Sequence, residues 1–265
     1  MGSGLESDRW RSGSVFTEGV EFTIPMTDQI VKWWETRFGR YDMFPKDLCS
    51  FLVADLPFAR TCQITGVDLD REIVCVEIQG IDALGEVYLT ARSVEFAERQ
   101  VHLNMTDLRT DVQGHGYGTL LARNCYRLAR RLELDRLGVT AIGGGSYVWA
   151  RAGFLPTHKS WNDERCKQRI ANHLIHIPEL DWETANNVYT MLGSDDEQTM
   201  WDLSDLEERV RSCYRPDKLI PLGRALLAES GASWKGTLEM NENDTDSHAE
   251  QLMRARSYLG LDASE

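Results

Sequence analysis

Four consecutive segments between residues 61 and 108 alternate apolar and polar side chains with a period of two. Turn signals at residues 68–70 and 80–85 separate them, and the segments are 61–69, 73–79, 86–91 and 100–108. Loops this short join only antiparallel neighbours, because parallel strands need a crossover of a dozen or more residues. The sequence therefore predicts an antiparallel meander and not a series of βαβ units.

Helical patterns lie on both sides of this meander. Thr27 is a predicted N-cap for a helix whose apolar positions recur at helical spacing and which ends at Gly39, and a weaker helical stretch covers 44–56. After the meander, an amphipathic helix is expected from Thr119 to about Leu134, followed by a short strand over 137–142. The predicted class is α+β, or mixed α/β, with a mostly antiparallel central sheet flanked by helices.

A glycine-rich turn joins the last strand of the meander to this helix. It reads Gln113-Gly114-His115-Gly116-Tyr117-Gly118. Glycine accepts positive φ and lets the backbone approach a ligand closely. Successive N–H groups at a helix N-terminus bind anions such as a pyrophosphate. The same pattern also fits a glycine-rich turn that binds nothing.

Two motifs here resemble those of the GNAT superfamily of N-acetyltransferases, over residues 21–160 and most densely over 100–156. Gln113, Gly116 and Gly118 match the cofactor motif, in which Gln or Arg precedes two small residues, and Gly153-Phe154 matches the end of a later short helix. The resemblance implies a splayed pair formed by strand 137–142 and the strand that ends at Leu108, with a cleft between them.

The resemblance also implies acetyl-CoA or another acyl-CoA as cofactor, and direct attack of an amine in a ternary complex. A bulged strand ending near Leu108 would bond the pantetheine arm, and its main-chain N–H would meet the oxyanion. The turn and helix start would hold the pyrophosphate. The implied cofactor-binding residues are Leu108, Gln113, Gly114, His115, Gly116, Tyr117, Gly118 and Thr119.

The sequence offers three candidate catalytic residues. Many family members place a tyrosine, which protonates the departing thiolate, four residues before the Gly of Gly-Phe, but here that position is Trp149. Tyr147 is the alternative acid, and Glu77 and Glu86 on predicted strands are candidate bases. An inward-facing carboxylate among Val, Ile and Tyr would have a raised pKa. Equally, Tyr147 fits a packed aromatic, and each glutamate fits an outward-facing strand residue.

Charge divides the chain unevenly. Residues 1–177 carry 21 Lys or Arg and 23 Asp or Glu, whereas residues 178–265 carry 8 and 19. We expect a flexible leader over 1–20, a core over 21–177 and an acidic, mostly helical extension over 178–265. Ser204 with Glu207 fits a capping box that would start one of its helices. The acidic region permits a basic partner and disfavours strong nucleic-acid binding.

The six cysteines are scattered without CxxC spacing, which favours reduced thiols and a cytoplasmic protein, and no segment is long and apolar enough for a membrane. His173 and His176 have a spacing seen in metal ligands. No carboxylate stands near them in the HExxH-like arrangement of metalloproteases, so no metal site is expected. The expected acceptor is an amine on a small molecule or a macromolecule.

Two other functions remain open. Gly114, Gly116 and Gly118 also match the glycine pattern of S-adenosylmethionine-dependent methyltransferases, although those folds need a parallel βαβ unit. With Trp149 in the place of the tyrosine, the chain also fits a catalytically degenerate GNAT-like protein that serves as a binding platform.

Overall fold

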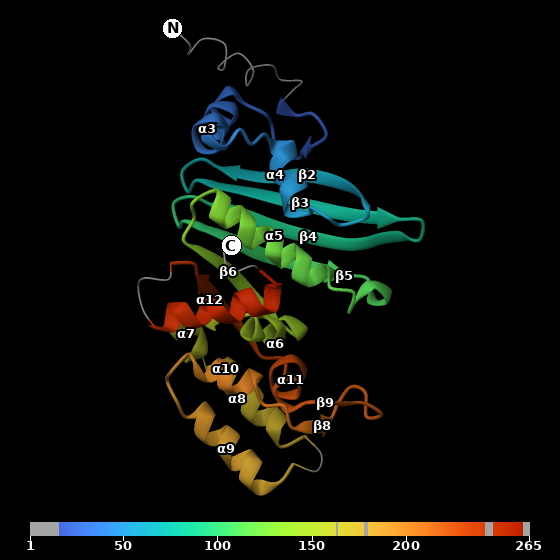
Figure 1. The fold of residues 1–265 in the computed structure, drawn as a ribbon, viewed down its shortest axis with the longest axis vertical. Helices are drawn as coiled ribbons and strands as arrows, with labels where there is room; N and C mark the ends of the chain where they lie inside the picture. The colour runs from blue at the N-terminus through green and yellow to red at the C-terminus, as the bar shows by residue number, and fades with distance from the viewer. Residues whose placement is uncertain (1–15, 163, 178–179, 242–245, 262–265) are drawn as a thin grey trace. The chain divides into compact units, whose positions relative to one another are not determined.

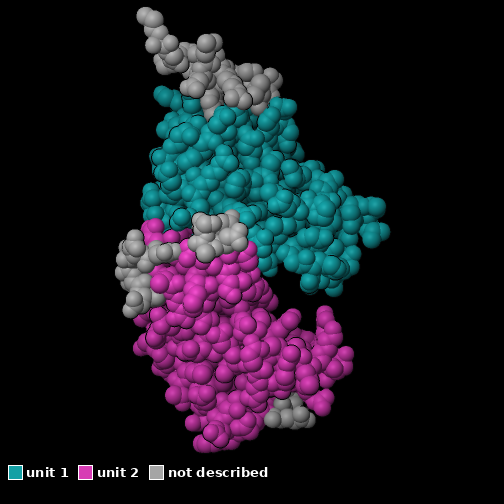
Figure 2. All heavy atoms as spheres, in the orientation of Figure 1, with its two compact units in different colours: residues 1–137 teal, residues 138–265 magenta. Residues whose placement is uncertain are grey.

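The computed structural model describes residues 16–162, 164–177, 180–241 and 246–261. The chain divides into two compact units, residues 1–137 and 138–265 (Figure 2). The boundary between these units lies 40 residues before the one expected from the charge distribution. Most of the expected leader, residues 1–15, lies outside the described residues.

The first unit is built on the antiparallel meander that the sequence predicts. Each strand pairs with the next, and short β1 runs parallel to β2. The strands are β1 (Glu21–Phe22), β2 (Ala59–Asp68), β3 (Ile73–Asp82), β4 (Gly85–Glu95) and β5 (Gln100–Leu108). The α+β class with a mostly antiparallel sheet is thereby confirmed.

One face of this meander packs against helices. Val74, Val76 and Ile78 of β3 are buried on this face. Residues 88, 90, 92 and 94 of β4 lie on the same face, because each pairs directly with a buried residue or glycine of β3. The helices of this unit are α3 (Asp28–Phe38), α4 (Pro45–Leu52) and α5 (Tyr117–Arg131), with 3₁₀ turns η1 (Gly39–Tyr41) and η2 (Thr110–Val112). Asn124 of α5 donates to the carbonyl of Ala54 at 2.9 Å, which ties α5 to the end of α4 (Figure 1).

Aromatic side chains form the core beneath α3. Thr27 caps this helix as predicted, accepting a hydrogen bond from the amide of Ile30. Trp34 is fully buried, and its ring meets that of Phe16 edge-on at 5.7 Å. Phe16 lies in the segment expected to be a flexible leader. That expectation is wrong for residues 16–20, because burial of the Phe16 ring fixes them.

The second unit begins within β6 (Arg136–Ile142) and continues through α6 (Gly144–Arg151), β7 (Leu155–Pro156) and α7 (His158–Trp161). Gly153, between α6 and β7, has φ +90°. A Cβ at this position would lie 2.5 Å from the main-chain oxygen of Gln251 in α12 (Asp246–Leu259). The Gly-Phe signature therefore marks a close approach of two backbones as well as a turn.

The acidic region is not a simple extension of this unit. Strand β10 (Ser233–Glu239) returns to pair antiparallel with β7, where Gly236 faces Pro156 and Thr237 faces Leu155. Most of the acidic region thus lies between two paired strands. The intervening elements are α8 (Glu164–Leu174), α9 (Trp182–Leu192), α10 (Thr199–Ser204), β8 (Arg209–Arg211), β9 (Leu219–Pro221), α11 (Leu222–Arg224) and the π-helical turn η3 (Ala225–Glu229).

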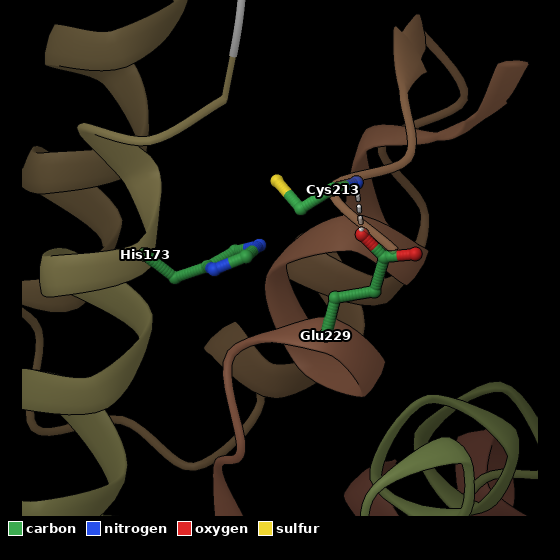
Figure 3. Close-up of side chains that lie close together, drawn as sticks. All are labelled: His173, Cys213 and Glu229. Atoms are coloured by element: carbon green, nitrogen blue, oxygen red, sulfur yellow. Dashed lines mark hydrogen bonds between the residues drawn. The ribbon is translucent and has the colours of Figure 1, made fainter. Parts of the chain in front are cut away.

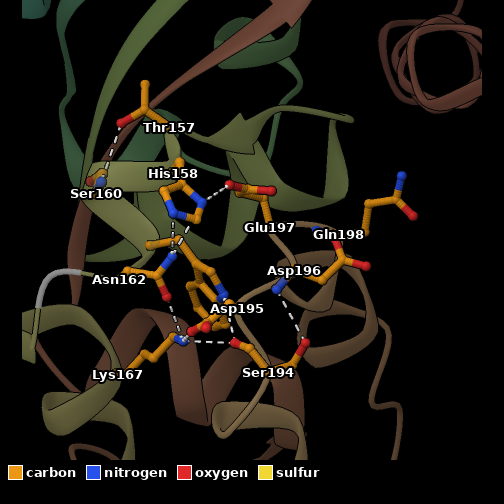
Figure 4. Close-up of polar contacts among 11 residues, drawn as sticks. Thr157, His158, Ser160, Asn162, Lys167, Ser194, Asp195, Asp196, Glu197 and Gln198 are labelled. Carbon is orange, nitrogen blue, oxygen red and sulfur yellow. Dashed lines mark hydrogen bonds and ion pairs between the residues drawn. The ribbon is translucent and has the colours of Figure 1, made fainter. Parts of the chain in front are cut away.

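The residues between β7 and β10, 157–232, form an inserted region. Polar contacts join its start to its middle (Figure 4). The imidazole of His158 pairs with Glu197 at 2.7 Å. Lys167 donates to the side-chain oxygen of Asn162 at 2.8 Å and to the carbonyl of Ser194 at 2.6 Å. These bonds connect α7 and α8 to the segment that precedes α10.

The six cysteines are free thiols, and four of them are buried. In the part of the chain that the structure describes, none of the helices has both the length and the apolar character needed to cross a bilayer.

Candidate functional site

The strand that leads into the glycine turn carries a β-bulge. Ala91 of β4 pairs with Met105 of β5, but the next residue, Arg92, pairs with Leu103. Asn104 is therefore the extra residue, and residues 104–107 are exposed. A bulge bends a strand and re-aims its backbone. The bulged strand that the GNAT resemblance implies before the turn is present.

A buried arginine holds this bulge from the neighbouring strand. Arg92 is 2% exposed and donates hydrogen bonds to the main-chain carbonyl of Met105 and to the Thr106 hydroxyl, the latter at 2.7 Å. Its Nε lies 3.2 Å from the sulfur of Cys125 in α5. Sequence analysis missed Arg92, although it occupies a position of β4 that faces the core, where a charged residue is unusual.

The glycine turn is shaped by side-chain bonds to its own backbone. The side-chain amide of Gln113 donates to the carbonyl of Leu108 at 2.8 Å, and His115 Nδ1 lies 3.1 Å from the carbonyl of Val112. Gly114 and Gly116 have φ of +85° and +83°. A side chain at either position would be strained, which explains the two glycines.

The main-chain N–H groups of residues 114–119 donate no hydrogen bond to any residue that the structure describes. Residues 113–116 are exposed, and a Cβ built on Gly114 or Gly116 would meet nothing within 4 Å. The first intrahelical bond of α5 is the one from Leu120 to the carbonyl of Gly116, at 2.9 Å. The turn and the helix start thus present a row of unbonded N–H groups beside open space, which suits an anion.

Aromatic rings border this turn. The ring of Tyr117 stacks on His115, with 6.2 Å between centroids, and meets Phe58 edge-on at 5.1 Å. Gly118 packs closely, because a Cβ there would lie 3.6 Å from a methyl group of Leu108. These contacts fix the start of α5 relative to the end of β5.

The two candidate bases lie on the sheet face that points away from α5. Glu77 pairs with Gln63 and Ala91 and is half-buried. Glu86 is exposed, and its carboxylate accepts a hydrogen bond from Gln79. Glu86 is thus the outward-facing strand residue that the sequence also allowed, because the strand pairing turns it to solvent.

The candidate acid belongs to the second unit. Tyr147 is half-buried in α6, and burial raises the pKa of its hydroxyl above the usual value, while the charge of Arg151 opposes this shift. Trp149 packs edge-on against Phe154 at 5.3 Å. Trp149 is therefore a packing residue of the Gly-Phe turn.

No family model matches the chain, and no curated protein matches it. The chain is similar to the solved structure of a nourseothricin acetyltransferase, with 18% identity over 33% of this chain and 53% of that chain and a TM-score of 0.28. It is also similar to an acetyltransferase from Bacillus cereus ATCC 14579, with 12% identity over 51% of this chain and 83% of that chain and a TM-score of 0.26. This chain spans about half the length of the first of these structures. Both similarities are weak, so a functional proposal has to rest on the residues of this chain.

Proposed function

We propose that this chain is an acyl-CoA-dependent N-acyltransferase. The observation that carries the proposal is the row of unbonded amides at residues 114–119, which follows the bulged strand β5 and opens the 15-residue helix α5. Aligned peptide dipoles give a helix N-terminus roughly half a positive charge. Unbonded N–H groups at such an end bind phosphate groups, and coenzyme A carries a pyrophosphate.

In this proposal the main chain does most of the binding. The amides of residues 114–119 hold the pyrophosphate, and the backbone of β5 up to Leu108 bonds the pantetheine arm. Acyl-CoA supplies a thioester, whose carbonyl carbon the amine attacks. A main-chain N–H of the bulged strand stabilises the negative charge that develops on the carbonyl oxygen. Much of the rate then comes from alignment of the amine with that carbon.

Glu77 is the better of the two candidates for the base that takes the amine proton. Glu77, Ala91 and Met105 follow one another in register across β3, β4 and β5, so all three face the same side of the sheet. This row ends at the residue that follows the bulge. Glu86 is exposed and already accepts a hydrogen bond from Gln79. Glu77→Gln should lower kcat by about 10²-fold or more, and Glu98→Gln in the turn after β4 is the control.

Tyr147 is the candidate for the acid that protonates the departing thiolate. A tyrosine hydroxyl is protonated at physiological pH and able to donate, and burial raises its pKa further. The alternative is a domain that binds acyl-CoA without transfer. This alternative is favoured by Trp149, which stands where many members of the family have the catalytic tyrosine. Its ring packs against Phe154.

A screen of ligands and acceptors tests the proposal. Acetyl-CoA and longer acyl-CoAs should raise the melting temperature, and small amines and basic peptides should be tried as acceptors while release of free CoA thiol is followed. Thermal stabilisation with no thiol release from any amine would favour the binding platform. Stabilisation by S-adenosylmethionine alone would replace the proposal with a methyltransferase.

A further inference from the structure

Three side chains of the second unit meet at a place that the transferase proposal does not use (Figure 3). His173 comes from the last turn of α8, Cys213 from the segment after β8, and Glu229 from the end of η3. One nitrogen, one sulfur and one oxygen atom of these residues all lie within 4.8 Å of one another. Each residue is half-buried, so the cluster is not a solvated surface of like charges.

Glu229 is held in place by the segment that carries Cys213. The amide of Cys213 donates to one carboxylate oxygen at 2.8 Å, and the hydroxyl of Ser212 donates to the other. The hydroxyl of Tyr214 donates to the main-chain carbonyl of Glu229 at 3.0 Å. The carboxylate is thus oriented, and each of its oxygens keeps a lone pair for a further partner.

His173 offers a nitrogen that has no partner. Its Nε2 atom is buried and makes no hydrogen bond to any residue that the structure describes. Burial also lowers the pKa of the imidazole. An unpartnered buried nitrogen is costly, and a ligand in the cluster would satisfy it.

We propose that His173, Cys213 and Glu229 bind one divalent transition-metal ion of the zinc class. Such ions take imidazole nitrogen, thiolate sulfur and carboxylate oxygen at about 2.0–2.3 Å. In a tetrahedral site these ligand atoms are roughly 3.5 Å apart, so small side-chain rotations complete the geometry. On binding, the Cys213 sulfur bonds the metal and its proton leaves to solvent. A water molecule takes the fourth position.

The same three residues do not suit a cysteine nucleophile. Burial, and next the negative charge of Glu229, raise the pKa of the Cys213 thiol. A nucleophilic cysteine needs the opposite shift, since the thiolate is the reactive form. A bound dication would remove the conflict between the carboxylate and the thiolate, because it attracts both.

The sequence did not reveal this site because its ligands are far apart in the chain. In the sequence, His173 stood out only by its spacing from His176. His176 lies beyond the end of α8 at Leu174 and is exposed. The ligands that the fold adds are 40 and 56 residues away from His173. The ion would join α8, the segment after β8 and η3, which are three parts of the inserted region. This role is independent of acyl transfer.

Metal titration of the full chain tests the proposal. After treatment with a chelator, the protein is titrated with Co²⁺, whose bond to a thiolate gives a charge-transfer absorption in the near ultraviolet. We expect this absorption to saturate at one equivalent, and Zn²⁺ to abolish it and raise the melting temperature. The absence of the absorption in the wild-type chain would overturn the proposal.

Two variants identify the ligands. Cys213→Ser should remove the charge-transfer absorption, and His173→Gln should abolish saturable binding, while Cys75→Ser, a half-buried thiol of the first unit, should behave as the wild type. Circular dichroism of each metal-free variant establishes that its fold is intact. An unaltered absorption in a folded Cys213→Ser protein would refute the assignment.

Discussion

The guanidinium of Arg92 donates a hydrogen bond to the main-chain carbonyl of Met105, directly after the bulge in β5. The same carbonyl accepts a second bond, at 3.2 Å, from the hydroxyl of Thr90. Two side chains of β4 therefore bond the carbonyl of the residue that follows the bulge. This anchoring keeps the bulge in one conformation, and the bulged strand leads directly to the glycine turn.

Replacement of Arg92 should loosen the bulge. Arg92→Met leaves the hydroxyl of Thr106 and the carbonyl of Met105 with fewer donors, and we expect it to lower the free energy of unfolding by about 2 kcal/mol. It should also raise the KM for acyl-CoA. Urea unfolding and steady-state kinetics measure the two effects, and Arg71→Met on an exposed turn is the control. Equal stability of the two variants would show that the buried guanidinium does not anchor the strand.

A strand glycine gives an independent test of the meander. The ring of Tyr88 lies over Gly80 in the neighbouring strand, and a Cβ on Gly80 would lie 2.0 Å from a ring carbon. Gly80→Ala should therefore destabilise the protein by about 1–3 kcal/mol, the usual cost of overpacking. Gly66→Ala is the matched control, since its Cβ would lie 3.6 Å from Cys75. Chemical denaturation of both variants measures the difference, and similar losses in the two would contradict this packing.

Much of the first unit was predictable because its signals are local. Alternation with period two and short turns identified the four strands of the meander, and Thr27 marked the start of α3. The glycine turn was recognisable because positive φ and a helix start both leave clear residue preferences. The candidate cofactor-binding residues came from this turn, the adjoining Leu108 and Thr119, and the resemblance to the GNAT superfamily.

The remaining features depend on contacts between distant residues. The pairing of β10 with β7 joins segments about 80 residues apart, so the acidic region was taken for an extension. Ser204 was expected to cap a helix, but it ends α10 and is buried, which makes that prediction wrong. The bond between Arg92 and Met105 lies beside the bulge that shifts the register, and no local sequence pattern predicts it.

Acid should weaken the protein through one ion pair at the end of the β3–β4 hairpin. Arg109 donates two bonds to the carboxylate of Asp82, at 2.7 and 3.0 Å, which lowers the pKa of Asp82 from 3.8 to about 2. Because the folded pKa is the lower one, the pair stabilises the protein above pH 4, and this contribution is lost as the pH falls towards 2. Unfolding measured across this range should show a smaller pH dependence in Asp82→Asn than in the wild type. Identical slopes would contradict this account.

Loss of the Tyr147 hydroxyl should slow turnover without weakening cofactor binding. If this hydroxyl protonates the departing thiolate, Tyr147→Phe should lower kcat by about 10²-fold or more and leave the KM for acyl-CoA nearly unchanged. Because burial raises the pKa of Tyr147, the wild-type kcat should not fall as the pH rises through the usual range of a tyrosine pKa. Tyr189→Phe, on the exposed side of α9, is the control. Unchanged turnover in Tyr147→Phe would remove its assigned role.

Calorimetric titration with acetyl-CoA tests the central claim most directly. Gly116→Asp places a carboxylate beside the unbonded amides of the turn, whereas Gly19→Asp alters another glycine with positive φ and open surroundings. We expect saturable binding to the wild type and to Gly19→Asp, and none to Gly116→Asp. Equal affinity of all three proteins, or no binding to the wild type, would contradict a pyrophosphate site at residues 114–119.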